Sequence, residues 1–323
     1  LIENYEEEYM EKVLENIGKI ERNIKIVLDC GNAVPGPLAV KALERLGVEV
    51  IPIYCEWDNS FPNHPPDPTR QSNMIDLGKS VIEHGAEFGI GMDGDGDRLG
   101  VVDENGEFIH PDRLIGIFAK DVLAKITKDS TDDERTILFD VKCSMAVEEA
   151  IHNLGGIPRM VRTGHTFMKT ELREHPGIPL AGEMSGHFFM NDDWYGFDDS
   201  IYSAARLLQI VGRDDAPSDG GPTFSERFDF MPEYPTTDEG KVPLTGERKE
   251  TMSAVLEAFS DMKKSTVDGI RVRYENGWYL CRPSNTEPIL VMRAEGRDKN
   301  ALDDILADVN ARIGHIVDLK KLK

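Results

Sequence analysis

The sequence is poor in cysteine, in long apolar runs and in positive charge. Its four cysteines are scattered over 323 residues with no CxxC pair, at Cys30, Cys55, Cys143 and Cys281. This usage argues against a disulfide framework or a zinc site, and it favours a reducing, cytoplasmic location. No stretch approaches the run of about 18 apolar residues that a membrane-spanning helix needs, so we expect no membrane protein.

The charge balance limits the possible partners. Lys and Arg number 37 against 59 Asp and Glu, which gives a formal net charge of −22. Such a surface repels nucleic-acid phosphates and anionic lipids, so we expect neither nucleic acid nor a membrane as a partner. An anionic substrate would require a site with its own concentrated positive charge or a metal ion.

Strand and helix patterns alternate along the first two thirds of the chain. We predict two consecutive α/β domains with mixed, largely parallel sheets over residues 1–107 and 108–214, followed by a smaller α+β domain over 215–323. A segment dense in Gly, Pro and Asp, residues 212–223, reads as the linker before the last domain.

Short sequence patterns predict two individual helices and two hairpins. We expect a helix over 200–211 and a closing helix with Asp298 as its N-cap. Asn105-Gly106 suits a two-residue hairpin turn, and a second hairpin is expected around Asn276-Gly277.

Three aspartates separated only by glycines follow a predicted strand, at Asp93, Asp95 and Asp97, with Arg98 next. A glycine-permitted loop can fold their oxygens onto one hard cation, which removes their mutual repulsion. An EF-hand loop does not fit, because Arg98 stands where that loop needs glycine and the flanks read as strands. An acidic surface turn is the plain alternative, and a magnesium site is the prediction.

A second polar cluster, GEMSGH, ends the second predicted domain. Its Glu183, Ser185 and His187 can donate to or accept from vicinal hydroxyls. Any one of them alone would suit an ordinary strand-to-loop turn.

A third cluster, RPSNTEP, lies in the last predicted domain. An arginine fork, hydroxyls and loop N–H groups make a phosphate cradle from Arg282, Ser284, Asn285 and Thr286. The alternative is an ordinary strand connection with a surface arginine.

Two strand ends carry further basic groups. Lys142 and His165 are candidates to supply positive charge and proton transfer beside a phosphate. Taken alone, Lys142 would be a surface lysine and His165 a hydrogen-bonded structural histidine. Together the four clusters describe one polar ligand held in a cleft between three domains, and a sugar phosphate fits that description.

The strings that carry these residues resemble the α-D-phosphohexomutase family, the phosphoglucomutases and phosphomannomutases. They occur in the family's order and span essentially the whole chain from about Ile24: DGDGDR (93–98), DVKC (140–143), RTGH (162–165), GEMSGH (182–187), GFDDSIYSAARLL (196–208) and RPSNTEP (282–288).

The resemblance implies a role for each matched residue. Asp93, Asp95 and Asp97 would bind Mg²⁺, with Arg98, Lys142 and His165 as catalytic residues near the transferred phosphoryl group. Sugar hydroxyls would be bound by Glu183, Ser185 and His187, and the non-reacting phosphate by Arg282, Ser284, Asn285 and Thr286. The ligands would be a hexose phosphate and a hexose bisphosphate.

The chain departs from the family's pattern at the phosphoryl donor. Family members carry a phosphoserine in a loop resembling T-A-S-H-N-P on a first domain, and this sequence has no Ser-His dipeptide. With Leu1 as its first residue, the chain is expected to hold the last three of four domains, and the absent N-terminal domain is a possible partner.

The resemblance implies an intramolecular phosphotransferase, an isomerase that interconverts hexose 1- and 6-phosphates through a bisphosphate. We expect this chain alone to bind sugar phosphate and Mg²⁺ without turnover. Met184 resembles the residue of the glucose and mannose members, whereas the glucosamine mutases tend to carry Gln there, so the resemblance implies a glucose or mannose substrate. Three alternatives remain: a phosphoglucosamine mutase, a non-catalytic sugar-phosphate-binding short form, and a metal-dependent phosphatase with Asp93 as nucleophile.

Overall fold

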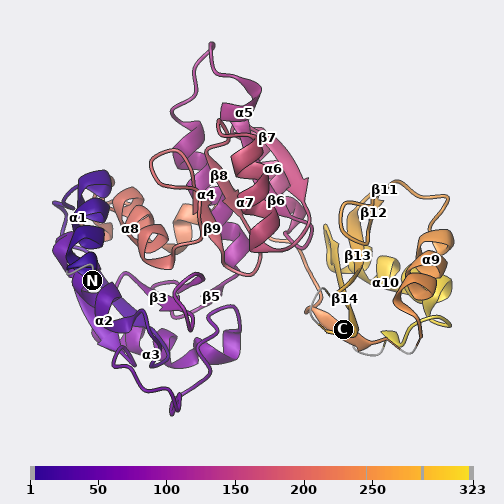
Figure 1. The fold of residues 1–323 in the computed structure, drawn as a ribbon, viewed down its shortest axis with the longest axis horizontal. Helices are drawn as coiled ribbons and strands as arrows, with labels where there is room; N and C mark the ends of the chain where they lie inside the picture. The colour runs from indigo at the N-terminus through magenta and orange to yellow at the C-terminus, as the bar shows by residue number, and fades with distance from the viewer. Residues whose placement is uncertain (1–3, 245, 285–286, 320–323) are drawn as a thin grey trace. The chain divides into compact units, whose positions relative to one another are not determined.

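The computed structural model describes residues 4–244, 246–284 and 287–319 (Figure 1). Its contacts group the chain into two compact units. Of the described residues, the first unit contains 4–139, 149–159 and 164–231, and the second contains 140–148, 160–163 and those from 232 onward. Among the helices of the described ranges, none has the length and hydropathy that crossing a bilayer requires.

The first sheet is mixed, with strand order β2-β1-β3-β4-β5. Strands β2, β1 and β3 run parallel, and β4 and β5 add antiparallel to them. The strands are β1 (Lys25–Asp29), β2 (Glu49–Ile53), β3 (Phe88–Met92), β4 (Leu99–Val102) and β5 (Phe108–Ile109). Strand β3 is buried along its whole length, as expected for a central strand covered on both faces.

Helices α2 (Gly36–Arg45) and α3 (Ile75–His84) pack on this sheet, with a 3₁₀ turn η1 (Gln71–Asn73) before α3. Helix α1 (Tyr5–Ile17) packs against α2 and against α8 (Ser200–Val211). Helix α3 contributes Leu77 and Val81 to a buried apolar cluster with Val27 of β1 and Val102 of β4. The apolar periodicity of the helix thus matches the apolar face of the strands, which fixes the layer arrangement.

The second sheet has strand order β7-β6-β8-β9. Strand β6 (Thr136–Asp140) pairs parallel with β8 (Leu180–Gly182), and β9 (Phe188–Met190) pairs antiparallel with β8. The remaining elements are β7 (Ile157–Val161), α4 (Pro111–Leu123), α5 (Asp132–Arg135), α6 (Met145–Asn153), α7 (His165–Glu174) and α8 (Ser200–Val211). Helix α8 occupies the predicted residues, and the Asp199 side chain caps it by accepting from Tyr202 N.

The residues after the predicted linker pack back on the first unit. Two 3₁₀ turns follow one another here, η2 (Pro217–Asp219) and η3 (Ser225–Phe228). The Phe224 ring stacks on Phe88 with ring centroids 4.1 Å apart, and the Ser225 hydroxyl donates to Glu104 over 2.6 Å. These contacts anchor the chain before it enters the C-terminal sheet.

The C-terminal sheet is antiparallel, with strand order β10-β14-β13-β12-β11. Its strands are β10 (Gly240–Pro243), β11 (Lys264–Ser265), β12 (Ile270–Tyr274), β13 (Gly277–Pro283) and β14 (Ile289–Gly296). Helices α9 (Arg248–Ala258) and α10 (Lys299–Ile313) pack against it around a core that includes Phe259 and Tyr279. The predicted cap is present, because Asp298 accepts from Ala301 N over 2.8 Å.

The prediction of α/β domains followed by an α+β domain is confirmed, but one turn differs from its prediction. Val102 pairs with Phe108, and Asp103 N donates to Glu107 O, so the hairpin loop has three residues, 104–106, rather than two. Gly106 has φ +76°, the left-handed conformation that closes such a loop at little cost for glycine. In the second hairpin Tyr274 pairs with Gly277, which leaves a two-residue turn.

The Phe224 contact gives a stability test. Replacing Phe224 with Ala removes the ring that stacks on Phe88 in a buried position, and comparable substitutions cost about 3–5 kcal/mol. We expect a lower urea midpoint for unfolding of the first unit, which contains both rings. Tyr5→Ala is the control, because Tyr5 is 64% exposed and surface substitutions usually shift stability by about 0.5 kcal/mol or less. Equal midpoints for the two variants would contradict this packing.

Candidate active site

The aspartate loop is organised around Asp93, which follows β3 and is fully buried. Its Oδ1 accepts the backbone N–H groups of Gly96, Asp97 and Arg98 over 3.0–3.1 Å. Its Oδ2 accepts from Arg98 Nε over 2.7 Å. Gly96 has φ +80°, so glycine permits the turn that brings these donors together.

Burial and ion pairing set the charges of this loop. Burial raises the pKa of Asp93 to about 6, against the opposing effect of the Arg98 guanidinium. Burial also acts to raise the pKa of Asp97, but hydrogen bonding and attraction to His187 outweigh it and leave the pKa lowered. Arg98 has a second partner, because its Nη1 donates to Asp67 over 3.2 Å.

The loop offers a suitable set of ligands for a hard cation. Asp93, Asp95 and Asp97 each have a carboxylate oxygen within 4.8 Å of the others. Closely spaced carboxylates match the oxygen donors that Mg²⁺ takes from proteins. The residues present therefore fit the predicted magnesium site.

The GEMSGH segment lies directly beside this loop. Gly186 O accepts from Leu99 N over 2.9 Å, and the backbones of His187 and Arg98 form an isolated antiparallel β-bridge. As a result, His187 Nε2 lies 3.4 Å from Asp97 Oδ1. The structure thus brings the predicted metal ligands and the predicted sugar-binding residues to one place in the first unit.

Two groups hold the other side of the His187 ring. Its Nδ1 lies 3.1 Å from Glu183 Oε2 and 2.9 Å from Ser185 Oγ. Burial alone would lower the pKa of His187, but its bonds to Asp97 and Glu183 raise it to about 9. Glu183 is itself fixed, because its Oε1 accepts from Gly164 N over 2.5 Å.

His165 begins α7 and stands next to His187. The two rings stack with centroids 5.7 Å apart and planes inclined by 16°. His165 Nδ1 lies 3.0 Å from Lys169 Nζ and 3.2 Å from Asp198 Oδ2, and Lys169 also donates to Asp198 Oδ1 over 2.8 Å. His165 therefore lies between a lysine and a carboxylate.

Lys142 belongs to the second unit, where C-terminal strands hold its backbone. Its carbonyl oxygen accepts from Arg293 Nη1 over 2.5 Å, and its Nζ lies 3.2 Å from Glu239 Oε2. The preceding carbonyl, that of Val141, accepts from Arg271 Nη1 over 2.9 Å.

Arg282 is also part of the second unit and is buried. Its Nε donates to Asp268 Oδ2 over 2.7 Å, and the same oxygen accepts from Thr163 N over 3.2 Å. Ser284 is buried too, and its hydroxyl accepts from Glu287 N. The other two predicted phosphate ligands, Asn285 and Thr286, lie outside the described residues.

The structure also adds residues that the sequence reasoning missed. Asp67, Asp198, Glu239 and Asp268 each pair with a predicted site residue. Asp198 lies in the GFDDS string, one of the segments that resemble the family, so the sequence contained a signal for it. The other three are separated from their partners by 14 to 97 residues along the chain, and nothing local marks them.

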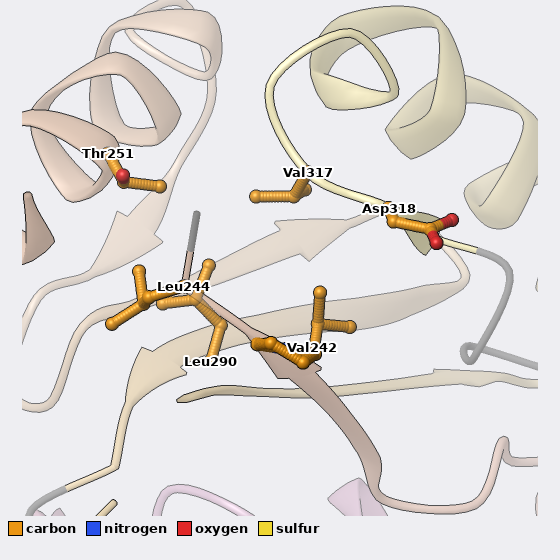
Figure 2. A pocket seen from close by; sticks show the side chains of 7 residues that line it. Val242, Leu244, Thr251, Leu290, Val317 and Asp318 are labelled. Carbon is orange, nitrogen blue, oxygen red and sulfur yellow. The ribbon is translucent and has the colours of Figure 1, made fainter. Parts of the chain in front are cut away.

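A cavity of about 170 Å³ in the C-terminal fold contains none of the predicted site residues. Figure 2 shows that Val242, Leu244 and Leu290 face it from one side and Val317 and Thr251 from the other. Its mainly apolar lining does not suit a sugar phosphate.

Comparison with known proteins identifies the family. Three models of phosphoglucomutase/phosphomannomutase match in succession: α/β/α domain II over residues 7–106, α/β/α domain III over 110–234 and the C-terminal domain over 239–312. The chain belongs to the phosphoglucomutase/phosphomannomutase family. The resemblance seen in the sequence motifs is thereby confirmed.

Individual relatives agree with this membership. A Pseudomonas putida phosphomannomutase/phosphoglucomutase is 42% identical over 290 residues, which cover 89% of this chain and 60% of the relative. A Neisseria gonorrhoeae phosphoglucomutase is 39% identical over 292 residues, with 89% and 60% covered. The chain thus spans about 60% of the length of the curated relatives it matches.

Solved structures of the family share the fold. A Burkholderia thailandensis family protein matches with a TM-score of 0.84 at 37% identity, covering 96% of this chain and 64% of that one. An Aspergillus fumigatus N-acetylphosphoglucosamine mutase, solved with a sugar phosphate and magnesium, matches with a TM-score of 0.67 at 15% identity, covering 96% and 70%. The second likeness shows the fold alone.

The metal loop can be tested directly. Asp95→Asn removes one negative ligand from the set of three, and we expect Mg²⁺ affinity to fall at least about tenfold, or about 1.4 kcal/mol. Isothermal titration calorimetry with Mg²⁺ measures this. Asp76→Asn is the matched control, because Asp76 lies on α3 and pairs with Lys79. Equal Mg²⁺ affinities for both variants would exclude the loop as the magnesium site.

Proposed function

We propose that this chain carries the metal-binding, sugar-binding and phosphate-binding parts of a phosphohexomutase. The reaction interconverts hexose 1-phosphate and hexose 6-phosphate, of glucose, mannose or both, through a bisphosphate intermediate. The phosphoryl donor would be a phosphoserine on a further domain. Support comes from the names of the relatives and from the order in which the three family domains match.

One contact carries the proposal, namely the approach of His187 Nε2 to Asp97 Oδ1 at 3.4 Å. It joins the predicted metal loop to the residues predicted to bind sugar hydroxyls. A reacting oxygen on the sugar would therefore lie close to both a cation and an imidazolium. Phosphoryl transfer depends mainly on such positioning and charge stabilisation.

Each residue has a defined part in this proposal. Bound Mg²⁺ would neutralise charge that develops on the transferred phosphoryl group. Arg98, held by Asp93 and Asp67, would add positive charge at the same place. His187 would hold or release a proton at Nε2, with its ring oriented by Glu183.

The remaining predicted residues would bind the rest of the ligand. Glu183 and Ser185 would pair with ring hydroxyls, and His165 beside them would assist proton movement. Lys142 would supply charge at the reacting phosphate. Arg282, oriented by Asp268, would bind the phosphate that does not react. Because either phosphate of a bisphosphate can be the non-reacting one, Arg282 would have to bind both equally well.

The phosphatase alternative fits the contacts poorly. Asp93 Oδ1 accepts three backbone N–H groups and Oδ2 accepts from Arg98, so the capacity left on Oδ2 would be taken by the cation rather than used for attack. The substrate preference rests on Met184 and on relatives named for glucose and mannose phosphates.

The phosphate role of Arg282 predicts a symmetrical defect. Arg282→Lys replaces a planar fork with a point charge, and hydrogen bonds to charged groups contribute about 1.5–3 kcal/mol. We expect glucose 1-phosphate and glucose 6-phosphate to bind roughly tenfold more weakly, and by similar factors, in calorimetric titrations. The control is Arg273→Lys on β12, whose side chain is 65% exposed. A defect for one isomer alone would refute this role.

The mutase reaction itself is tested by a coupled assay that converts glucose 1-phosphate to glucose 6-phosphate. The 323-residue chain with Mg²⁺ should bind both isomers without turnover, and addition of the phosphoserine domain of a relative should be needed for activity. Sustained turnover by the chain alone would contradict the proposed phosphoserine donor. Failure to bind either isomer would contradict the mutase assignment.

A further inference from the structure

We propose that Asp97, His187 and Asp198 form a second cation site, one that selects a nitrogen-binding divalent metal such as Zn²⁺ or Co²⁺. The site shares Asp97 with the predicted magnesium loop but uses a different set of ligands. It rests on the geometry of this chain and does not require the mutase assignment to be correct.

The ligand atoms are already gathered. One carboxylate oxygen of Asp97, one of Asp198 and a ring nitrogen of His187 lie within 4.8 Å of one another. A neutral imidazole suits zinc and similar metals, whereas Mg²⁺ favours oxygen ligands. Three protein ligands with one position left for water is the arrangement of an open zinc site.

The histidine is held as a metal ligand would be. Its Nδ1 faces Glu183 Oε2 at 3.1 Å and Ser185 Oγ at 2.9 Å, so Nε2 is the nitrogen turned toward Asp97. Glu183 is 1% exposed and anchored by Gly164 N, so it holds the ring firmly. A carboxylate behind the imidazole orients the ring and strengthens it as a ligand at most histidine–metal sites.

Asp198 supplies an independent observation. Its side chain is 7% exposed, and within the described part of the chain its Oδ2 accepts no hydrogen bond, although His165 Nδ1 lies 3.2 Å away. Lys169 holds the other oxygen, Oδ1, over 2.8 Å, which fixes the carboxylate. A buried carboxylate oxygen that accepts no hydrogen bond is costly, and a cation bound to this carboxylate would balance its charge.

Sharing Asp97 couples the two sites. A metal bound to Asp97, His187 and Asp198 would displace the proton on His187 Nε2 and withdraw Asp97 from the magnesium loop. Binding of either cation should therefore weaken binding of the other, by the same factor in both directions. The protein would in this way respond to a transition metal as well as to Mg²⁺.

The test is direct metal binding to the whole chain. Wild-type protein is titrated with Zn²⁺ by calorimetry, and the ¹⁵N resonances of its histidines are followed by NMR. We expect Zn²⁺ to shift the Nε2 resonance of His187. His187→Gln and Asp198→Asn should each weaken Zn²⁺ at least about tenfold, because even the loss of a partner behind a metal ligand costs about that much.

Two control variants separate the sites. Asp95→Asn should keep Zn²⁺ affinity while losing Mg²⁺ affinity, because Asp95 belongs only to the magnesium set. His84→Gln should change neither, because His84 is an exposed histidine on α3. Retained Mg²⁺ binding by Asp198→Asn shows that this variant is folded. The proposal is overturned if Zn²⁺ affinity survives in both His187→Gln and Asp198→Asn, or if Asp95→Asn abolishes it.

Discussion

The candidate site depends on the buried carboxylate of Asp93. Three backbone N–H groups and the Arg98 guanidinium converge on it, and this convergence defines the path of the loop between β3 and β4. A buried charge without such partners would be costly enough to be neutralised by a proton. With them, Asp93 acts as the centre of the turn that sets the positions of Asp95 and Asp97.

The three aspartates of the loop differ in how their charge is balanced. Asp93 is balanced by Arg98, and Asp97 by His187 at 3.4 Å. Asp95 is exposed to solvent, which leaves it available to a cation. Directly after the loop, Leu99 N donates to Gly186 O, next to His187. This hydrogen bond holds the His187 segment against the aspartate loop. The positions of the metal ligands and of the sugar-binding candidates are therefore set together.

Sequence patterns predicted the structural features that depend on residues close together in the chain. The Asp298 cap, the helix over 200–211 and the glycine-spaced aspartates each follow from neighbours within a few residues. The turn at Asn105-Gly106 was predicted too short, because the side chain of Asp103 accepts from Asn105 N and Glu107 N and thereby stabilises a longer loop. Partners such as Asp67 and Asp268 depend on the tertiary fold, and no pattern of neighbouring residues could identify them.

The second unit shows the same dependence on distant contacts. Trp278 Nε1 and Met145 N both donate to Glu295, and the Arg271 guanidinium lies 4.0 Å above the Trp278 ring. These buried groups fasten the segment that carries Lys142 to the C-terminal sheet. Lys142 therefore belongs to the same compact unit as Arg282, although the family's domain III includes its position and the sequence placed the two in different domains. The spacing between Lys142 and Arg282 is therefore set by contacts within one unit, the bond from Arg293 to the Lys142 carbonyl and the bond from Arg282 to Asp268.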